Sequence, residues 1–283
     1  MLSINVHNTH ATALDPQVIQ LRHFTDGALN MQCILPDSAT TLNNTPITIK
    51  WQYECEEELV ALIHLVFHLR EHGARELYLC MPYIPNARQD RVQSDEEVFT
   101  LKSFAKTINW LNFNAVYVCD AHSRVSLALL DRVVNIPPDR VLTKVLETVR
   151  AELHTDDIAI FYPDEGAMKR YNNSHHYPKA FGMKTRNPHT GRVDSLRIAG
   201  DAESIKGRHV LIVDDICSKG DTALRSANEL LRSGAKSVSL CITHCENTIL
   251  TNNELLNTLN KVYTTDSIYT SHHPKITIVQ EII

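Results

Sequence analysis

The segment of residues 210–224 constrains the fold of this chain more than any other stretch. Residues 210–213 are four consecutive aliphatic residues, a pattern typical of a strand that is covered on both faces of a parallel sheet. Asp214 and Asp215 follow, and a loop containing Gly220 then leads into a helical pattern. Because ligands of open α/β sheets bind beyond the carboxyl ends of the strands, this segment predicts a site for a phosphorylated sugar.

The residue types of the segment suit that ligand. Two adjacent carboxylates are costly to bury without a partner, and they can accept hydrogen bonds from vicinal ribose hydroxyls or approach Mg²⁺. Backbone N–H groups and hydroxyls at a helix amino terminus can wrap a phosphate. The residues expected to do so are Ser218, Lys219, Gly220 and Thr222. The alternative is a strand followed by ordinary helix-capping residues, since Asp, Ser and Thr are common caps.

The rest of the chain repeats the alternation of strand and helix. Apolar runs that end in polar residues lie at 76–81, 115–119, 158–162 and 237–242, and amphipathic helical patterns lie at 56–72, 100–112, 139–153, 222–233 and 253–260. This alternation predicts an α/β fold with parallel sheets flanked by helices. A chain of 283 residues is near the size at which one core splits into two. The consecutive prolines 137 and 138 suggest two domains, residues 1–137 and 138–283.

The charge balance favours a small-molecule partner. The formal net charge is −5 and the pI is about 6.3, so no basic field is available for nucleic acid or an anionic membrane. No apolar run approaches the length of a membrane span, and residues 1–10 lack the regions of a signal peptide. We therefore expect a cytoplasmic protein that binds neither nucleic acid nor membrane.

Two loops after predicted strands of the first half carry groups suited to a polyphosphate. Arg88 can form a forked contact with phosphate oxygens, Gln89 can contact a base or a phosphate, and Asp90 can orient an arginine. His122 follows Asp120 by two residues, so both side chains would point the same way if the strand continues through them. A solvated charged loop and a structural histidine are the alternatives.

A third segment predicts a protruding arm. Residues 184–194 contain Asn-Pro and Thr-Gly turn signals between two potential strands. Lys184 and Arg186 are two residues apart and would project from one face of that arm. In this position they could neutralise charge that develops on a transferred phosphoryl group. Exposed arm charges without a function are the alternative.

Together these segments resemble the ribose-phosphate diphosphokinase, or phosphoribosyl pyrophosphate synthetase, family. The resemblance covers nearly the whole chain, because six segments occur in the order of the family's motifs. They are similar to F-x-D-G-E, P-Y-x-P-Y-A-R-Q-D-R, D-L-H, P-D-x-G-G-x-K-R, K-x-R and the start of the phosphoribosyl-binding loop. In this chain they lie at residues 24–27, 82–91, 120–122, 163–170, 184–186 and 213–215.

The resemblance implies two type I phosphoribosyltransferase-like domains and a homo-oligomer, either a dimer or a hexamer. It implies a Mg²⁺-dependent transfer of the diphosphoryl group of ATP to the 1-hydroxyl of a 5-phosphorylated ribose, with AMP as the second product. The implied ATP-binding residues are Phe24, Asp26, Arg88, Gln89, Asp90 and His122. The implied metal-binding residues are His122 and Asp164, the implied catalytic residues are Lys184 and Arg186, and the implied acceptor-binding residues are Asp214, Asp215 and 218–222.

One departure from the family's motifs bears on the acceptor. The family's sugar-phosphate loop reads D-T-x-G-T, whereas this chain has Ser218-Lys219-Gly220-Asp221-Thr222. A carboxylate at Asp221 would repel a phosphate dianion. The alternative acceptor is therefore a larger 5-substituted ribose such as ADP-ribose. Two other readings are a phosphoribosyltransferase, which would need no ATP site, and a non-catalytic regulatory relative.

Overall fold

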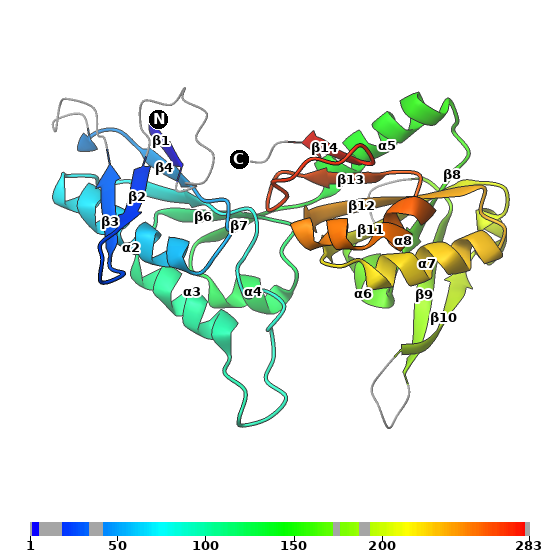
Figure 1. The fold of residues 1–283 in the computed structure, drawn as a ribbon, viewed down its shortest axis with the longest axis horizontal. Coiled ribbons are helices and arrows are strands. Elements are labelled where there is room, and N and C mark those ends of the chain that lie inside the picture. The colour runs from blue at the N-terminus through cyan, green and yellow to red at the C-terminus, as the bar shows by residue number, and fades with distance from the viewer. Residues whose placement is uncertain (1, 6–18, 34–41, 172–175, 187–192, 281–283) are drawn as a thin grey trace. The chain divides into compact units, whose positions relative to one another are not determined.

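The structure is a computed structural model that describes residues 2–5, 19–33, 42–171, 176–186 and 193–280. Contacts between residues divide the chain into two compact units, residues 1–136 and residues 137–282 (Figure 1). Within the described residues, no helix has the length and apolar character needed to cross a bilayer.

The first unit contains a five-stranded parallel sheet and a separate antiparallel hairpin. The strand order of the sheet is β1 (Leu2–Asn5), β4 (Ile47–Lys50), β5 (Leu77–Cys80), β6 (Ala115–Cys119) and β7 (Val133–Ile136). The hairpin consists of β2 (Ile19–His23) and β3 (Leu29–Cys33), and the helices are α2 (Glu57–Glu71), α3 (Thr100–Trp110) and α4 (Arg124–Leu129).

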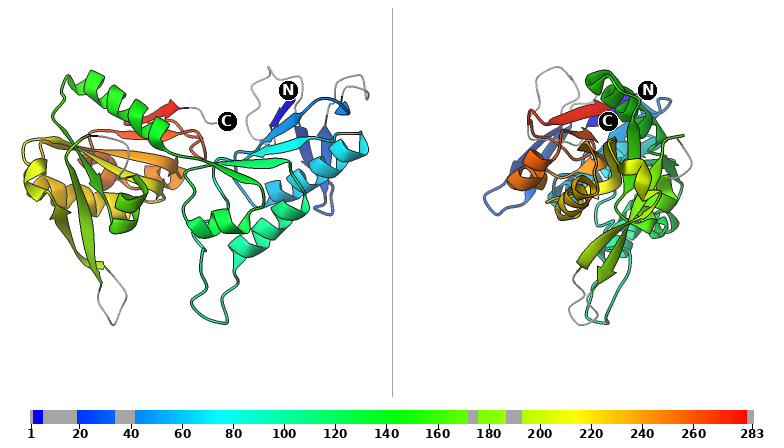
Figure 2. Two further views of the ribbon diagram at one scale, coloured as in Figure 1. Left: turned by 180° about the vertical axis from the view of Figure 1, so that it is seen from behind. Right: turned by 90° about the vertical axis from the view of Figure 1, so that its right-hand side faces the viewer.

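Burial alternates along the central strands of this sheet. Ile47 and Ile49 of β4 and Leu77 and Leu79 of β5 are buried, and the residues between them are partly exposed. The buried side chains form one core cluster with apolar residues of α2 and α3, which lie against the sheet (Figure 2). Helix α2 presents its buried residues at helical spacing, as its sequence predicts: Ala61, Leu62, Leu65, Val66 and Leu69.

The second unit contains a seven-stranded sheet. Its order is β10 (Val193–Gly200), β9 (Lys179–Arg186), β8 (Ile158–Tyr162), β11 (His209–Cys217), β12 (Ser237–Cys245), β13 (Val262–Thr265) and β14 (Ile276–Gln280). Only the β9–β10 pair is antiparallel, and this pair extends from the unit as a hairpin in both views of Figure 2. The helices are α5 (Asp139–Leu153), α6 (Glu165–Tyr171), α7 (Asp221–Arg232) and α8 (Asn253–Thr258), with 3₁₀ turns η1 (Ala202–Ile205) and η2 (Asn247–Thr251).

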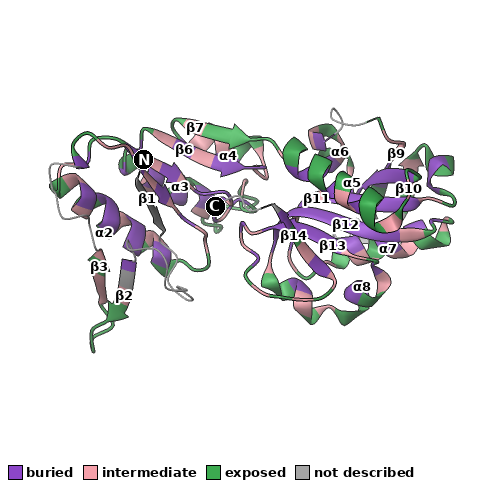
Figure 3. Cartoon of the chain, turned by 90° about the horizontal axis from the view of Figure 1, so that it is seen from above, coloured by how far each residue is buried: buried purple, intermediate pink, exposed green. Residues whose placement is uncertain are grey.

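Strand β11 is covered on both faces, as its aliphatic run predicts. Val210 and Ile212 pack into one core cluster, which includes α7, and Leu211 and Val213 pack into the other, which includes α5. Figure 3 shows β11 and β12 buried along most of their length. The prediction of an α/β fold with parallel sheets between helices is therefore confirmed.

The extent of β11 differs from the sequence-based expectation. Parallel pairing with β12 continues through Cys217 and Cys245, so Asp214 and Asp215 lie within the strand rather than after it. Helix α7 begins at Asp221, one residue earlier than its apolar pattern indicates. Backbone pairing with β12, which the pattern of one strand does not contain, sets the end of β11. The start of α7 is set by the hydrogen bond from the N–H of Leu224 to the carbonyl of Gly220 over 2.9 Å.

Candidate active site

The second unit has a buried acidic centre near the carboxyl end of β11. Asp215 is 4% exposed and Asp214 is partly buried. The backbone N–H of Asp215 donates to Oδ1 of Asp214 over 3.0 Å. Oδ2 of Asp215 lies 2.5 Å from Nη1 of Arg170, which comes from α6. The strand end thus combines two carboxylates with one guanidinium group.

The electrostatics of this centre favour the binding of a cation or of hydroxyl donors. Burial raises the pKa of Asp214 well above its ordinary value, and the negative charges of Asp215 and then Asp164 raise it further. A ligand that donates hydrogen bonds or brings positive charge relieves this repulsion. The acceptor residues predicted from sequence therefore lie in a setting that suits them.

The loop after β11 is tied to a neighbouring segment. The amide of Asn252 donates to the carbonyl oxygen of Lys219 over 2.7 Å, and the hydroxyls of Ser218 and Thr248 lie 3.3 Å apart. The loop ends at Gly220, which is the amino-terminal cap of α7 and makes no side-chain capping bond there. Asp221 and Thr222 form the exposed first turn of that helix. Its backbone N–H groups are oriented as in a helix-terminus anion site.

Gly220 is required in this loop by both its conformation and its surroundings. Its φ of +79° is unfavourable for other residues, and an added Cβ would overlap the buried Cδ2 of Leu255. We expect Gly220→Ala to lower the free energy of unfolding by roughly 2 kcal/mol, measured by urea denaturation.

Gly207→Ala is the matched control for this prediction. Gly207 also has a positive φ, +73°, but an added Cβ would meet nothing within 4 Å. The control variant should therefore lose only the cost of backbone strain, about 1 kcal/mol. Equal losses in the two variants would show that contact with Leu255 is unimportant.

Asp164 has a structural role in addition to its predicted metal role. Its Oδ1 accepts a hydrogen bond from the N–H of Ala167 over 3.0 Å and so caps the start of α6. The oxygen donors of Asp164 and Asp214 fit the preference of Mg²⁺, which uses one or two carboxylates together with substrate phosphates and water. Among the described side chains, no three His, Cys, Asp or Glu residues form a complete metal cage.

The predicted catalytic arm corresponds to the β9–β10 hairpin. The backbone of Lys184 pairs with Leu196, and that of Arg186 pairs with Val193. Both residues lie on β9 with one residue between them, so they occupy the same face of the strand. Their side chains, and residues 187–192, lie outside the described part of the structure, so their roles stay predictions.

In the first unit, the predicted nucleotide segment forms the tip of the β2–β3 hairpin. Oδ1 of Asp26 accepts a hydrogen bond from the N–H of Ala28 over 2.9 Å, and Gly27 has a φ of +85°. Asp26 therefore stabilises the turn itself. Phe24, at the same tip, is 57% exposed. Its aromatic ring is available to stack on a base.

The other predicted ATP residues lie in the loops after β5 and β6. Arg88 and Gln89 are exposed, and Oε1 of Gln89 accepts a hydrogen bond from the hydroxyl of Thr100 at the start of α3. Asp90, the remaining predicted residue of this loop, is partly buried.

The loop after β6 has a constrained backbone. Asp120 is 1% exposed and has a left-handed φ of +43°, and its N–H donates to the carbonyl of Ile136 over 3.0 Å. His122 is partly exposed just beyond it. Non-glycine residues in this conformation are uncommon and concentrate at binding sites.

Comparisons with known proteins agree with this architecture. The family described as "Phosphoribosyl transferase domain" matches residues 169–272. The ribose-phosphate pyrophosphokinase of Thermococcus kodakarensis is 29% identical over 230 residues, which cover 80% of this chain and 77% of the relative. The corresponding protein of Pyrococcus furiosus is 27% identical over 233 residues, with the same shares of each chain.

The solved structure of phosphoribosylpyrophosphate synthetase from Mycobacterium smegmatis has the same fold. The two structures superpose with a TM-score of 0.78 and 19% sequence identity. The match covers 100% of this chain and 95% of the Mycobacterium smegmatis chain. This chain is similar in sequence to ribose-phosphate pyrophosphokinases over most of its length. Its two α/β units have the phosphoribosyltransferase-like fold.

Several residues of this acidic centre and its loop are not identified as site residues by the sequence patterns. Arg170 contacts Asp215, and Thr248 and Asn252 contact the loop after β11. None of the three is among the site residues predicted from sequence. The sequence does contain an indication for Arg170, because this residue ends the segment that resembles P-D-x-G-G-x-K-R. The contacts of Thr248 and Asn252 depend on tertiary packing, and no sequence pattern indicates them.

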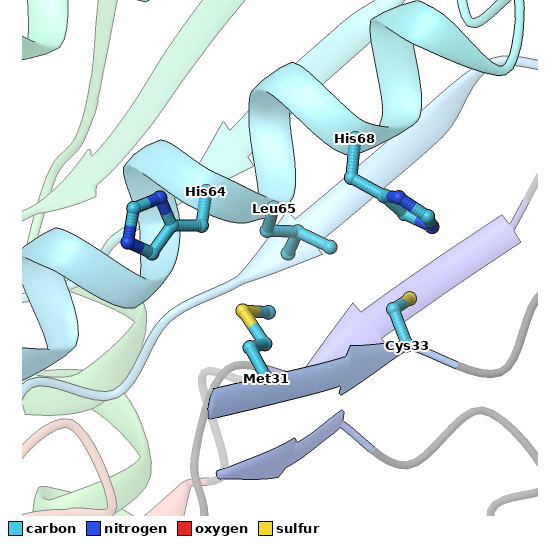
Figure 4. A pocket seen from close by; sticks show the side chains of 5 residues that line it. All are labelled: Met31, Cys33, His64, Leu65 and His68. Atoms are coloured by element: carbon cyan, nitrogen blue, oxygen red, sulfur yellow. The ribbon is translucent and has the colours of Figure 1, made fainter. Parts of the chain in front are cut away.

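A cavity of about 120 Å³ in the first unit has none of the predicted ATP residues among its described lining residues. Met31 and Cys33 of β3 and His64, Leu65 and His68 of α2 line it (Figure 4). Burial, and then the neighbouring His72, lower the pKa of His68. Soft-metal donors are present, but Leu65 lies between the two histidines along the wall, and these described residues do not form a metal group. We assign no function to this cavity.

Proposed function

We propose that this protein transfers the diphosphoryl group of ATP to ribose 5-phosphate and so forms phosphoribosyl pyrophosphate and AMP. The observation that carries the proposal is the acidic centre of Asp214 and Asp215, followed by the helix-terminus loop, in a chain similar to ribose-phosphate pyrophosphokinases. In the reaction the 1-hydroxyl oxygen of the sugar attacks the β-phosphorus of ATP. The bond from the β-phosphorus to the oxygen that bridges it to the α-phosphorus breaks, and AMP leaves with this oxygen. The proton of the attacking hydroxyl passes to water.

The second unit would bind the acceptor. Asp214 and Asp215 would accept hydrogen bonds from ribose hydroxyls, and the amino-terminal N–H groups of α7 would hold the 5-phosphate together with the side chains of Ser218, Lys219 and Thr222. Lys184 and Arg186 would stabilise negative charge on the transferred group in the transition state. Positioning and charge neutralisation suffice for such a transfer without a covalent intermediate.

The first unit would bind ATP. Phe24 and Asp26 at the hairpin tip would contact the adenine, and Arg88 and Gln89, oriented by Asp90, would contact the nucleotide beyond it. His122 would contact the triphosphate and its Mg²⁺, and Asp164 of the second unit would be a ligand of Mg²⁺. When bound, the ion would neutralise phosphate charge and orient the leaving group. We also expect a cytoplasmic homo-oligomer, either a dimer or a hexamer, whose mass light scattering would report.

The deciding experiment supplies the purified protein with Mg²⁺-ATP and one of several 5-substituted riboses, and identifies the products by mass. The proposal predicts AMP and a diphosphorylated sugar in equal amounts, and no turnover when Mg²⁺ is removed with EDTA. A protein that forms no AMP with any acceptor is not a diphosphokinase. Pyrophosphate release from a preformed diphosphorylated sugar and a free base would instead indicate a phosphoribosyltransferase.

A larger 5-substituted ribose such as ADP-ribose is the second candidate acceptor. The carboxylate of Asp221 lies in the exposed first turn of α7, where the 5-phosphate would bind. A phosphate within a diphosphate diester carries less negative charge than a terminal monoester, so it is repelled less by this carboxylate. Higher kcat/KM with ribose 5-phosphate than with ADP-ribose would eliminate this candidate.

Removal of the Asp221 charge should shift acceptor preference. We expect Asp221→Gly to raise the ratio of kcat/KM for ribose 5-phosphate over ADP-ribose by about 5-fold, because a repulsion of roughly 1 kcal/mol is lost. Asp221→Asn, which removes the charge and keeps the shape, should have most of this effect. An unchanged ratio in both variants would show that the carboxylate faces away from the ligand.

A further inference from the structure

The acidic centre contains a cation to which no function has been assigned above. Nη1 of Arg170 lies 2.5 Å from Oδ2 of Asp215, and the exposed fractions of the two side chains are 27% and 6%. An ion pair with this degree of burial is weakly screened by solvent. Removal of one partner leaves the other charge buried and uncompensated, which costs far more than the loss of a surface pair.

The position of Arg170 is set by a rigid aromatic support. Its guanidinium carbon lies 5.9 Å from the ring centre of the adjacent Tyr171, which is buried in the core between α5 and the sheet. The rings of Tyr171 and Tyr162 are stacked with their centres 6.2 Å apart, and the hydroxyl of Tyr162 donates to the carbonyl of Tyr171 over 3.2 Å. The guanidinium group therefore approaches β11 from a fixed point.

The neighbouring lysine has a different environment. Nζ of Lys169 pairs with Glu165 over 2.7 Å on the same helix, and both side chains are about two-thirds exposed. Consecutive basic residues of α6 thus face different surroundings: Lys169 faces solvent and Arg170 faces the acidic centre. This contrast provides a control one residue away from the test position.

We propose that Arg170 is a positioning residue of the acceptor site, acting through Asp215. It holds the Asp215 carboxylate by one oxygen and compensates part of the charge of the adjacent Asp214, which is locked to Asp215 by the backbone hydrogen bond. The pair of carboxylates is thereby oriented before the ribose hydroxyls arrive. This inference rests on the proposed binding of the acceptor at Asp214 and Asp215.

The inference predicts a selective loss of acceptor binding. Arg170→Gln should raise KM for the ribose acceptor roughly 30-fold, while KM for ATP changes less than about 2-fold. Arg170→Lys retains the charge but loses the planar fork, and it should recover most of the affinity. Lys169→Gln should leave both KM values unchanged.

A double-mutant cycle tests the route through Asp215. If Arg170 acts through that carboxylate, Arg170→Gln should add less than about 3-fold to the defect of Asp215→Asn. Fully additive defects would overturn the inference, as would equal increases in both KM values accompanied by a large fall in melting temperature, which indicates a purely structural role.

A calorimetric titration with ribose 5-phosphate and with ADP-ribose in the absence of ATP separates this inference from the proposed function. If the wild-type protein turns over and Arg170→Gln binds the acceptor as tightly as the wild type does, only the role of Arg170 is overturned. A wild-type protein that neither binds nor converts either acceptor overturns both. Acceptor binding that weakens in Arg170→Gln, even without turnover, supports the positioning role and contradicts only the proposed reaction.

Discussion

Replacement of Lys184 by alanine is expected to lower kcat for AMP formation by about 10³-fold with little change in KM for either substrate. The reason is that a cation on the arm would meet full negative charge only in the transition state. An interaction that is made only there affects kcat and leaves ground-state binding nearly intact. The measurement is AMP release at saturating ATP and acceptor, followed by mass or coupled assay.

Arg197→Ala is the matched control for the arm. Arg197 lies on β10 of the same hairpin, its backbone pairs with Met183 of β9, and its side chain is exposed. We expect this variant to keep kcat within about 2-fold of the wild type, since exposed charges contribute little unless they contact the reacting group. If Lys184→Ala retains more than a tenth of wild-type kcat, the lysine does not stabilise the transition state.

Stability is expected to fall steeply below pH 6.5 because of one buried histidine. His209 at the start of β11 is 2% exposed, and its Nδ1 lies 2.7 Å from Oγ of Ser237. Its Nε2 is also buried and has no hydrogen-bond partner among the described residues. Burial lowers the pKa of His209 from 6.5 to about 4, because the charged form is poorly solvated.

The sign of the effect follows from proton binding. Between pH 6.5 and 4 the unfolded chain binds a proton at this histidine and the folded protein does not. The contribution to stability is complete above pH 6.5 and is lost as the pH falls through this window. The full loss of stability is roughly 3 kcal/mol, because lowering a pKa by one corresponds to about 1.4 kcal/mol.

His209→Asn isolates this contribution from that of other titrating groups. The amide of asparagine reaches about as far as imidazole Nδ1 and does not titrate. The variant is expected to be less stable than the wild type at pH 7.5 because of its smaller side chain. The difference in the free energy of unfolding between the wild type and the variant should shrink by about 2 kcal/mol from pH 7 to pH 5. Urea unfolding at each pH measures the difference. A difference that stays constant with pH would contradict the assignment.

The sequence contained most of the fold and the outline of the acceptor site. Residues 210–213 are aliphatic at every position, and only a strand between two apolar layers satisfies all four side chains. Helix α2 was equally clear, since its apolar residues recur at helical spacing. These elements were predictable because their burial is encoded by local periodicity.

Short elements and their contacts were not encoded in the same way. Helix α4 spans only six residues. Its start is capped by the hydroxyl of Ser123, which accepts a hydrogen bond from the N–H of Ser126 over 3.3 Å. The continuation of β11 through Cys217 depends on pairing with Cys245 of β12. The end of β11 is set by a strand that is distant along the chain, and α4 is too short for its apolar residues to show a helical period.

Sequence alone determined which chemical groups this protein can present: two carboxylates at a strand end, a glycine loop before a helix, and a pair of cations on an arm. Only the tertiary structure decided their electrostatic setting. The packing of α6 against β11 brings the guanidinium of Arg170 to Asp215, and burial of the strand end raises the pKa of Asp214. Desolvation and ion pairing depend on distance in space, which the order of residues along the chain does not specify.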